Sequence, residues 1–270
     1  MNGHEAVHRL VVSADLKGSG SLGQQARLRA RRGMYEVFEA AFDAVGASGN
    51  LLHLEDRGDG VLAALAPQVP PSLLVGIWLE EVYQGLREHN AGERDPLRLR
   101  IAMHGGPVSH DGRGLVGRAV DLTCRLCDSE PARAVLDADD GIDLVFVVSD
   151  SLYHSVVADG GRFVEPEHYR PHRVRSKETD ETAWFHVPRR SRPPLPEPEQ
   201  AEAPQGPGRR DVPAAAGRPG ADSGPQRPTK YSITVNGGTN QVVDGAEVHG
   251  DINGVRVTRE DDSVDGGERA

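Results

Sequence analysis

The sequence predicts an α+β fold, with a mostly antiparallel sheet flanked by helices, in residues 1–188. Three observations predict it. Short apolar runs alternate with longer amphipathic stretches along this part of the chain. Two of these runs flank the turn Gly58-Asp-Gly60, as the strands of a hairpin do. A further run, Leu144 to Val148, is apolar at every position, which is typical of a strand buried on both faces.

The earlier elements follow from the same patterns. A first strand ends near Asp15 in a glycine-rich turn. Residues 51–65 predict the hairpin, and residues 72–89 predict a helix in which Ser72, after two prolines, is the N-cap. Residues 24–45 have the spacing of an amphipathic helix, with an apolar face made of Leu28, Met34, Val37, Phe38, Ala41, Phe42 and Val45.

The later elements complete the sheet. Residues 97–103 alternate between apolar and polar as a strand does. Asp150 directly follows the buried apolar run and is placed to cap the next helix. An apolar run at residues 183–187 predicts the last strand.

The composition changes after residue 188. Residues 189–230 are rich in Pro, Gly, Ala, Arg and Glu and carry almost no large apolar side chain, which predicts a disordered linker. Residues 231–258 contain short β-prone pieces separated by Gly and Asn, too few to form a core alone, so they either add strands to a protein partner or stay unstructured. Residues 259–270 are polar and predicted to be disordered.

The charge and hydropathy of the chain exclude some functions. A formal net charge of −10 argues against sequence-independent nucleic-acid binding, which needs a basic face. No run has the length of a membrane span, and the first residues lack the layout of a signal peptide, so we expect a cytoplasmic protein. Cys124 and Cys127 lie within a helical pattern and are interpreted as core residues rather than zinc ligands.

Two aspartates are candidate metal ligands. Asp15 ends a strand beside a glycine-rich turn that contains Lys17 and Gly18, and Asp59 lies at the tip of the hairpin. Carboxylates suit Mg²⁺, while the turn could cradle the phosphates of a bound nucleoside triphosphate. The alternative is that Asp15 caps the turn and Asp59 is an ordinary residue of a tight hairpin.

Four ordered motifs between about residues 8 and 188 resemble the catalytic domain of class III nucleotidyl cyclases, the adenylate and guanylate cyclase family. Each motif alone is weak, and together they are fairly specific. They are a strand leading into Ala14-Asp-Leu-Lys-Gly18, the hairpin Gly58-Asp59, a strand ending in His104 followed by the helical segment Gly117 to Leu126, and Lys177 before the last strand.

The resemblance implies a ferredoxin-like sandwich and an enzyme that forms a 3′,5′-cyclic nucleotide and pyrophosphate from a nucleoside triphosphate. It implies that Asp15 and Asp59 bind Mg²⁺ or Mn²⁺, and that Lys177 contacts the triphosphate. It also implies that Glu55 reads the base, and a glutamate can accept hydrogen bonds from guanine. Since sites of this family form between two catalytic domains, a homodimer is implied.

The sequence departs from the family at three positions. Arg125 is retained as the arginine that stabilises charge on the phosphate, but Asp121 stands where the family has asparagine. An aspartate four residues before an arginine is also a good intrahelical ion pair. The second base-reading position falls on Gly114, which has no side chain, and Glu178 follows Lys177 where a glycine is common.

These departures leave other functions open. The first alternative is a catalytically weak or inactive nucleotide sensor that signals through its C-terminal tail. The second is an interaction module that uses the cyclase-like fold only as a scaffold. The base is open too, because Arg57 beside the hairpin could serve a base other than guanine.

Overall fold

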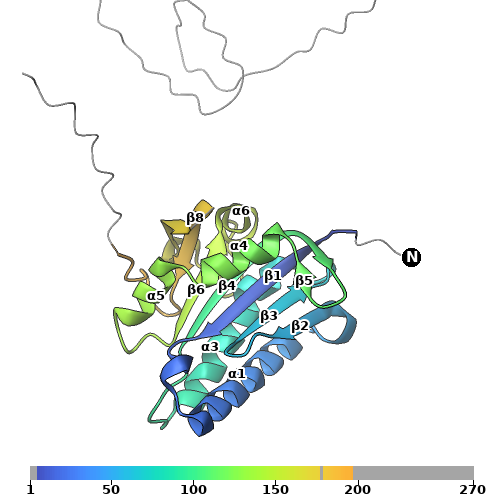
Figure 1. Cartoon of the computed structure of the whole chain (residues 1–270). Coiled ribbons are helices and arrows are strands. Elements are labelled where there is room, and N and C mark those ends of the chain that lie inside the picture. The colour runs from blue at the N-terminus through green and yellow to red at the C-terminus, as the bar shows by residue number, and fades with distance from the viewer. Residues whose placement is uncertain (1–4, 177–178, 197–270) are drawn as a thin grey trace, which may run out of the picture. The chain divides into compact units, whose positions relative to one another are not determined.

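The computed structural model describes residues 5–176 and 179–196. Its strands form one sheet in the order β2-β3-β1-β4-β6-β8-β7, with β5 paired to β4, as Figure 1 shows. The strands are β1 (Val7–Leu16), β2 (Leu52–Asp56), β3 (Gly60–Leu65), β4 (Leu99–His110), β5 (Leu115–Val116), β6 (Leu144–Ser149), β7 (Arg170–Ser176) and β8 (Thr179–His186).

All neighbouring strands are antiparallel except β4 and β6, which are parallel. The helices are α1 (Gln24–Ala44), α2 (Pro71–Leu73), α3 (Leu79–Asn90), α4 (Arg118–Cys127), α5 (Glu130–Asp137) and α6 (Asp150–Leu152). Short 3₁₀ or π segments are η1 (Ser19–Ser21), η2 (Gly49–Leu51), η3 (Leu74–Trp78), η4 (Tyr153–Val157) and η5 (Pro166–His168). This arrangement confirms the predicted α+β class with a mostly antiparallel sheet.

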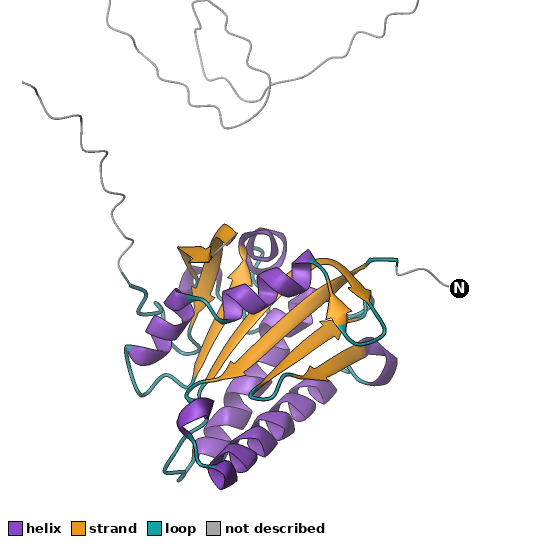
Figure 2. Ribbon diagram, viewed as in Figure 1, coloured by secondary structure: helices purple, strands orange, loops and turns teal. Residues whose placement is uncertain are grey.

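Helices cover both faces of the sheet (Figure 2). On one face, α1 and α3 bury the largest core, in which the rings of Phe38 and Trp78 stack with centroids 5.6 Å apart. On the other face, α4 and α5 pack on the alternate residues of the central strands, among them Val11, Ala102 and Val147. Because side chains alternate along a strand, each residue of β1 and β4 can be assigned to one of these two faces. We call the second one the α4 face.

Three details of the helices differ from the sequence predictions. Leu28, expected on the apolar face of α1, is 59% exposed, because buried residues of this helix begin only at Ala30. Pro70 rather than Ser72 is the N-cap of α2, since the fixed φ of Pro71 already suits the first helical position. Ser149 rather than Asp150 caps α6, its hydroxyl accepting from the Leu152 N–H, while Asp150 accepts from the indole of Trp184 at 2.9 Å.

The folded domain extends past residue 188. Arg190 pairs with Asp139 at 2.6 Å, Arg189 pairs with Glu80, and Leu195 packs on the core beneath α5. These contacts belong to residues 189–196, which the composition assigned to the linker. The predicted remainder of the linker, the β-prone tail and the polar end lie outside the described residues.

We predict that the chain beyond residue 196 adds nothing to the stability of this domain. A truncation after Pro196 should change the thermal midpoint by less than about 2 °C, because it leaves every contact among the described residues in place. A truncation after Val187 is the matched control and should lower it by about 3 °C or more, because it also removes the ion pairs of Arg189 and Arg190. Differential scanning calorimetry of the three proteins checks this, and a large drop for the truncation after Pro196 would mean that the tail packs on the domain.

Among the described residues, none of the helices combines the length and the apolar character needed to cross a lipid bilayer.

Candidate functional site

The structure brings Asp15 and Asp59 together at one end of β1. Asp15 is paired in register with Gly60, the residue after Asp59, and the Leu16 N–H donates to the Asp59 carbonyl at 3.0 Å. Gly60 permits this approach, since a Cβ there would lie 2.3 Å from the Ala14 carbonyl oxygen. The two carboxylates are near enough for the charge on Asp59 to raise the pKa of Asp15.

Burial is the larger influence on Asp15. It raises the pKa of this carboxyl, the Arg100 guanidinium lowers it, and the charge on Asp59 raises it again, so the net shift is upward. Repulsion between neighbouring carboxylates is one cause of a raised pKa. Repulsion contributes, but desolvation dominates.

Arg100 is a neighbour of Asp15 that the sequence did not reveal. Its guanidinium forms an ion pair with Asp15 and lies 3.6 Å from the carboxylate of Asp128, which also pairs with Arg133. The Arg100 side chain is only 11% exposed, and its Nε is buried without a hydrogen-bond partner in the part of the chain that the structure describes. Arg100 and Asp15 are directly opposite in the β1–β4 register, so the pair becomes visible only once that register is known.

The turn after β1 is organised differently from the prediction. Lys17 was expected to contact phosphates, but its ammonium lies 2.6 Å from the Asp137 carboxylate and donates to the Leu136 carbonyl, at the end of α5. Gly18 has φ 73°, a left-handed conformation that suits glycine. The hydroxyl of Ser19 donates to Asp59 at 2.6 Å. The turn therefore supports the Asp59 carboxylate, while Lys17 points elsewhere.

Glu55 and Gly114, the two base-reading positions of the resemblance, lie against each other. A Cβ on Gly114 would come within 3.2 Å of a Glu55 carboxylate oxygen, and the Leu115 N–H donates to that carboxylate at 2.6 Å. Arg57 and His53 also bond to it, at 2.9 and 3.0 Å. Burial alone would raise the pKa of Glu55, but these hydrogen bonds and charges outweigh it and the net pKa is lowered.

Asp121 and Arg125 line a groove of about 630 Å³ beside α4. The Arg125 guanidinium donates to the Thr179 hydroxyl at 2.9 Å, which directs it toward the start of β8. Thr179 follows Lys177 by two residues, but Lys177 itself lies outside the described residues. His104, also in the groove, bonds to Ser149 at 2.8 Å, a contact that suits a structural histidine rather than a base.

The two cysteines of α4 lie close to this region without forming part of it. Cys127 is fully buried and its thiol donates to the Arg100 carbonyl at 3.4 Å. Burial raises its pKa to about 12, so it stays a neutral thiol at physiological pH. Cys124 is half-buried and packs on the core beneath α4.

The candidate site residues described by the structure share the α4 face of the sheet or lie at its edge. On this face, Asp15 alternates with the core residues of β1, and Glu55 is opposite Leu62 of the core beneath α4. Asp121 and Arg125 project from α4 itself. These groups are nevertheless spread over the face, because Arg125 reaches β8, which is separated from β1 by β4 and β6.

The fold is similar to that of several solved structures. No protein-family profile and no curated protein sequence matches the chain. Among solved structures, the guanylyl cyclase Cya2 is similar, with a TM-score of 0.50 and 18% sequence identity over 69% of this chain and 95% of that one. An adenylate/guanylate cyclase/hydrolase from Silicibacter pomeroyi has the same TM-score and identity, over 68% of this chain and 98% of that one. The chain therefore has the fold of class III adenylate and guanylate cyclase catalytic domains, as a divergent example.

Proposed function

We propose that this protein binds a nucleoside triphosphate with Mg²⁺ or Mn²⁺ on the α4 face and converts it to a 3′,5′-cyclic nucleotide and pyrophosphate. The observation that carries the proposal is the meeting of Asp15 and Asp59 at the edge of a face that also holds Glu55, Asp121 and Arg125. The fold alone would not suggest chemistry, since one fold serves many functions. The proposal places the reaction in the cytoplasm.

The carboxylates at the C-terminal end of β1 suit a hard divalent cation. Asp15 and Asp59 offer carboxylate oxygens, which are the ligands that Mg²⁺ prefers. A bound ion would polarise the phosphates and lower the pKa of the ribose 3′-hydroxyl. Ser19 holds the Asp59 carboxylate in place, while Arg100 must share Asp15 with the ion.

The proposed reaction is an intramolecular displacement at the α-phosphorus. The 3′-oxygen forms a bond to that phosphorus, the bond from it to the bridging β-phosphate oxygen breaks, and the hydroxyl proton passes to solvent. Arg125 would donate to the α-phosphate oxygens and stabilise the charge that builds on them. Lys177, close in sequence to the Arg125 partner Thr179, would hold the triphosphate.

A second copy of the chain is part of the proposal. Three strand spacings separate β1 from β8, roughly 14 Å, so Arg125 bonded to Thr179 does not reach a phosphate held at Asp15 and Asp59 of the same chain. A homodimer would bring Asp15 and Asp59 of one chain against the groove beside α4 of the other.

The base-reading role is assigned to Glu55. Its carboxylate would accept from the N1–H and exocyclic amine of guanine, and its lowered pKa keeps it an acceptor near neutral pH. Gly114 lies directly against the Glu55 carboxylate and supplies no second polar side chain. We therefore propose GTP as the preferred triphosphate.

Incubation of the full-length protein with each of the four nucleoside triphosphates and Mg²⁺ or Mn²⁺, followed by mass spectrometry for cyclic products, tests the reaction. Equilibrium binding of the same nucleotides tests the site without turnover. A cyclic product from GTP that depends on the divalent ion supports the proposal. Absence of both product and binding for all four nucleotides would overturn it.

We expect Asp121→Asn to turn over at least as fast as the wild type, with a gain of up to about tenfold, the equivalent of 1.4 kcal/mol. Asparagine keeps the hydrogen-bonding shape and removes a negative charge beside the phosphates. Asp121→Ala is the matched control and should be slower than Asp121→Asn, because it removes the shape as well. The measurement is the initial rate of cyclic product at saturating nucleotide. Loss of activity in Asp121→Asn would show that the carboxylate has a role of its own.

A further inference from the structure

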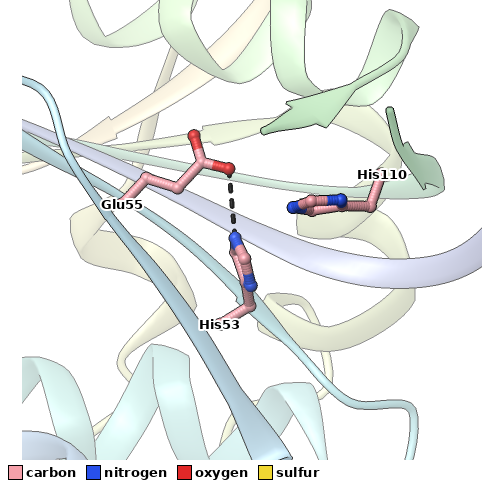
Figure 3. Close-up of side chains that lie close together, drawn as sticks. All are labelled: His53, Glu55 and His110. Carbon is pink, nitrogen blue, oxygen red and sulfur yellow. Dashed lines mark hydrogen bonds and ion pairs between the residues drawn. The ribbon is translucent and has the colours of Figure 1, made fainter. Parts of the chain in front are cut away.

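Three side chains with metal-binding atoms meet beside the hairpin of β2 and β3. His53 and Glu55 come from β2, and His110 is the last residue of β4 (Figure 3). One ligand atom from each lies within 4.8 Å of the other two. The imidazole Nε2 of His53 is 3.0 Å from a Glu55 oxygen, and the two histidine rings meet edge-on at 5.3 Å between centroids.

The course of β2 and β4 explains why these three side chains lie close together. His53 and Glu55 are two residues apart on a strand, so both side chains project to the same side of the sheet, which is the α4 face. The long β4 continues beyond its pairing with β1 and turns back through β5, and this brings His110 over β2. In Figure 3 the outer edge of the His110 ring points toward Glu55.

We propose that His53, Glu55 and His110 bind one divalent transition-metal ion, with Zn²⁺ as the best match. Two imidazole nitrogens and one carboxylate oxygen are a donor set for Zn²⁺, Co²⁺ or Ni²⁺, whereas Mg²⁺ prefers oxygen ligands alone. Ligand atoms around a tetrahedral zinc ion are separated by roughly 3.3 Å, from metal–ligand distances near 2.0–2.1 Å. The spacing between His53 and Glu55 is already close to that value.

The surroundings of Glu55 resemble the outer contacts that orient metal ligands. The Leu115 N–H and the Arg57 guanidinium hold its carboxylate, and Arg57 bonds to the oxygen that does not contact His53. Outer contacts of this kind typically strengthen metal binding ten- to a hundredfold. The Gly112 N–H donates to Nδ1 of His110, so binding through the other ring nitrogen requires that bond to break as the ring proton moves.

This site is distinct from the edge that holds Asp15 and Asp59. Three ligands leave further coordination positions of the ion for water or another small donor. The proposed metal site depends only on the three side chains and is independent of the proposed cyclase activity. Its test is accordingly made without nucleotide.

The test is a titration of Zn²⁺ into the EDTA-treated full-length protein by isothermal calorimetry, with millimolar Mg²⁺ present to occupy the site at Asp15 and Asp59. We expect one high-affinity Zn²⁺ per chain, and at least about a tenfold loss of affinity in His53→Ala and in His110→Ala. His154→Ala is the matched control, since it removes an exposed histidine that lies 3.4 Å from Asp150, and it should bind like the wild type.

A second measurement covers variants that fold poorly. Co²⁺ bound by the wild-type protein should give visible d–d absorption, and His110→Gln should change it while leaving the thermal midpoint of the metal-free protein unchanged. Wild-type-like zinc affinity in both His53→Ala and His110→Ala, or no zinc binding by the wild type, would overturn the proposal.

Discussion

Replacing Asp59 with alanine is expected to abolish cyclic nucleotide formation, with a loss on the order of a thousandfold or more in kcat. Metal stabilisation of the phosphates contributes several kcal/mol to such reactions, and each 1.36 kcal/mol corresponds to a factor of ten. Asp59→Asn should lose as much activity, because it keeps a hydrogen-bond acceptor for Ser19 but removes the charge. The measurement is the rate of cyclic product at saturating nucleotide and Mn²⁺.

The control for this prediction is Asp43→Ala, which removes an exposed carboxylate near the end of α1. It should retain the wild-type rate. Thermal midpoints of all three variants separate loss of the site from loss of the fold. Activity within tenfold of the wild type in Asp59→Asn would mean that the carboxylate does not hold the ion.

Replacing Arg100 with alanine is expected to lower the free energy of unfolding by about 3 kcal/mol. The change removes the partner of a mostly buried carboxylate, and the pKa of Asp15 should rise further because Arg100 is the main influence that lowers it. The value is at the low end of what broken buried ion pairs cost, since Asp15 is 28% exposed. Urea denaturation at neutral pH measures it.

Arg133→Ala is the matched control. Arg133 also pairs with a carboxylate of this cluster, that of Asp128, but both side chains are more than half exposed. Surface pairs of this kind contribute about 0–1 kcal/mol. Equal small losses in the two variants would show that Arg100 does not stabilise Asp15.

The class of fold and the order of most elements could be predicted from the sequence because both depend on local periodicity, whereas β5, α5 and β7 were not predicted. The apolar run of β6 and the hairpin around Asp59 lie where the patterns placed them. The helix starts were less predictable. Pro70 and Ser149 are the N-caps in place of Ser72 and Asp150, because a cap depends on backbone geometry at single residues.

The candidate site was predictable only as far as turns and motifs define it. Asp59 lies in the turn of the β2–β3 hairpin, which a local pattern indicates. It meets Asp15 because β3 pairs with β1. Lys17 was assigned to phosphates, yet a carboxylate on α5, some 120 residues later in the sequence, attracts it in the structure. Arg100 is likewise placed by strand register, which no local pattern encodes.

The cluster of His53, Glu55 and His110 was only partly predictable from the sequence. The spacing of His53 and Glu55, two residues apart on a strand, predicts a shared face, and that signal was available in the sequence. Their third partner comes from β4, more than fifty residues away, so the cluster itself required the sheet order.

Glu55 carries both a proposed base-reading role and a proposed metal-binding role, and this has a consequence for how the protein is prepared. Imidazole ligands also accept Ni²⁺, so chromatography on immobilised nickel would load the His53–Glu55–His110 site during purification. A carboxylate committed to nickel is not available to guanine. Base preferences measured on such material would then reflect the nickel ion as well as the protein, and chelator treatment before nucleotide assays would restore the intrinsic selectivity.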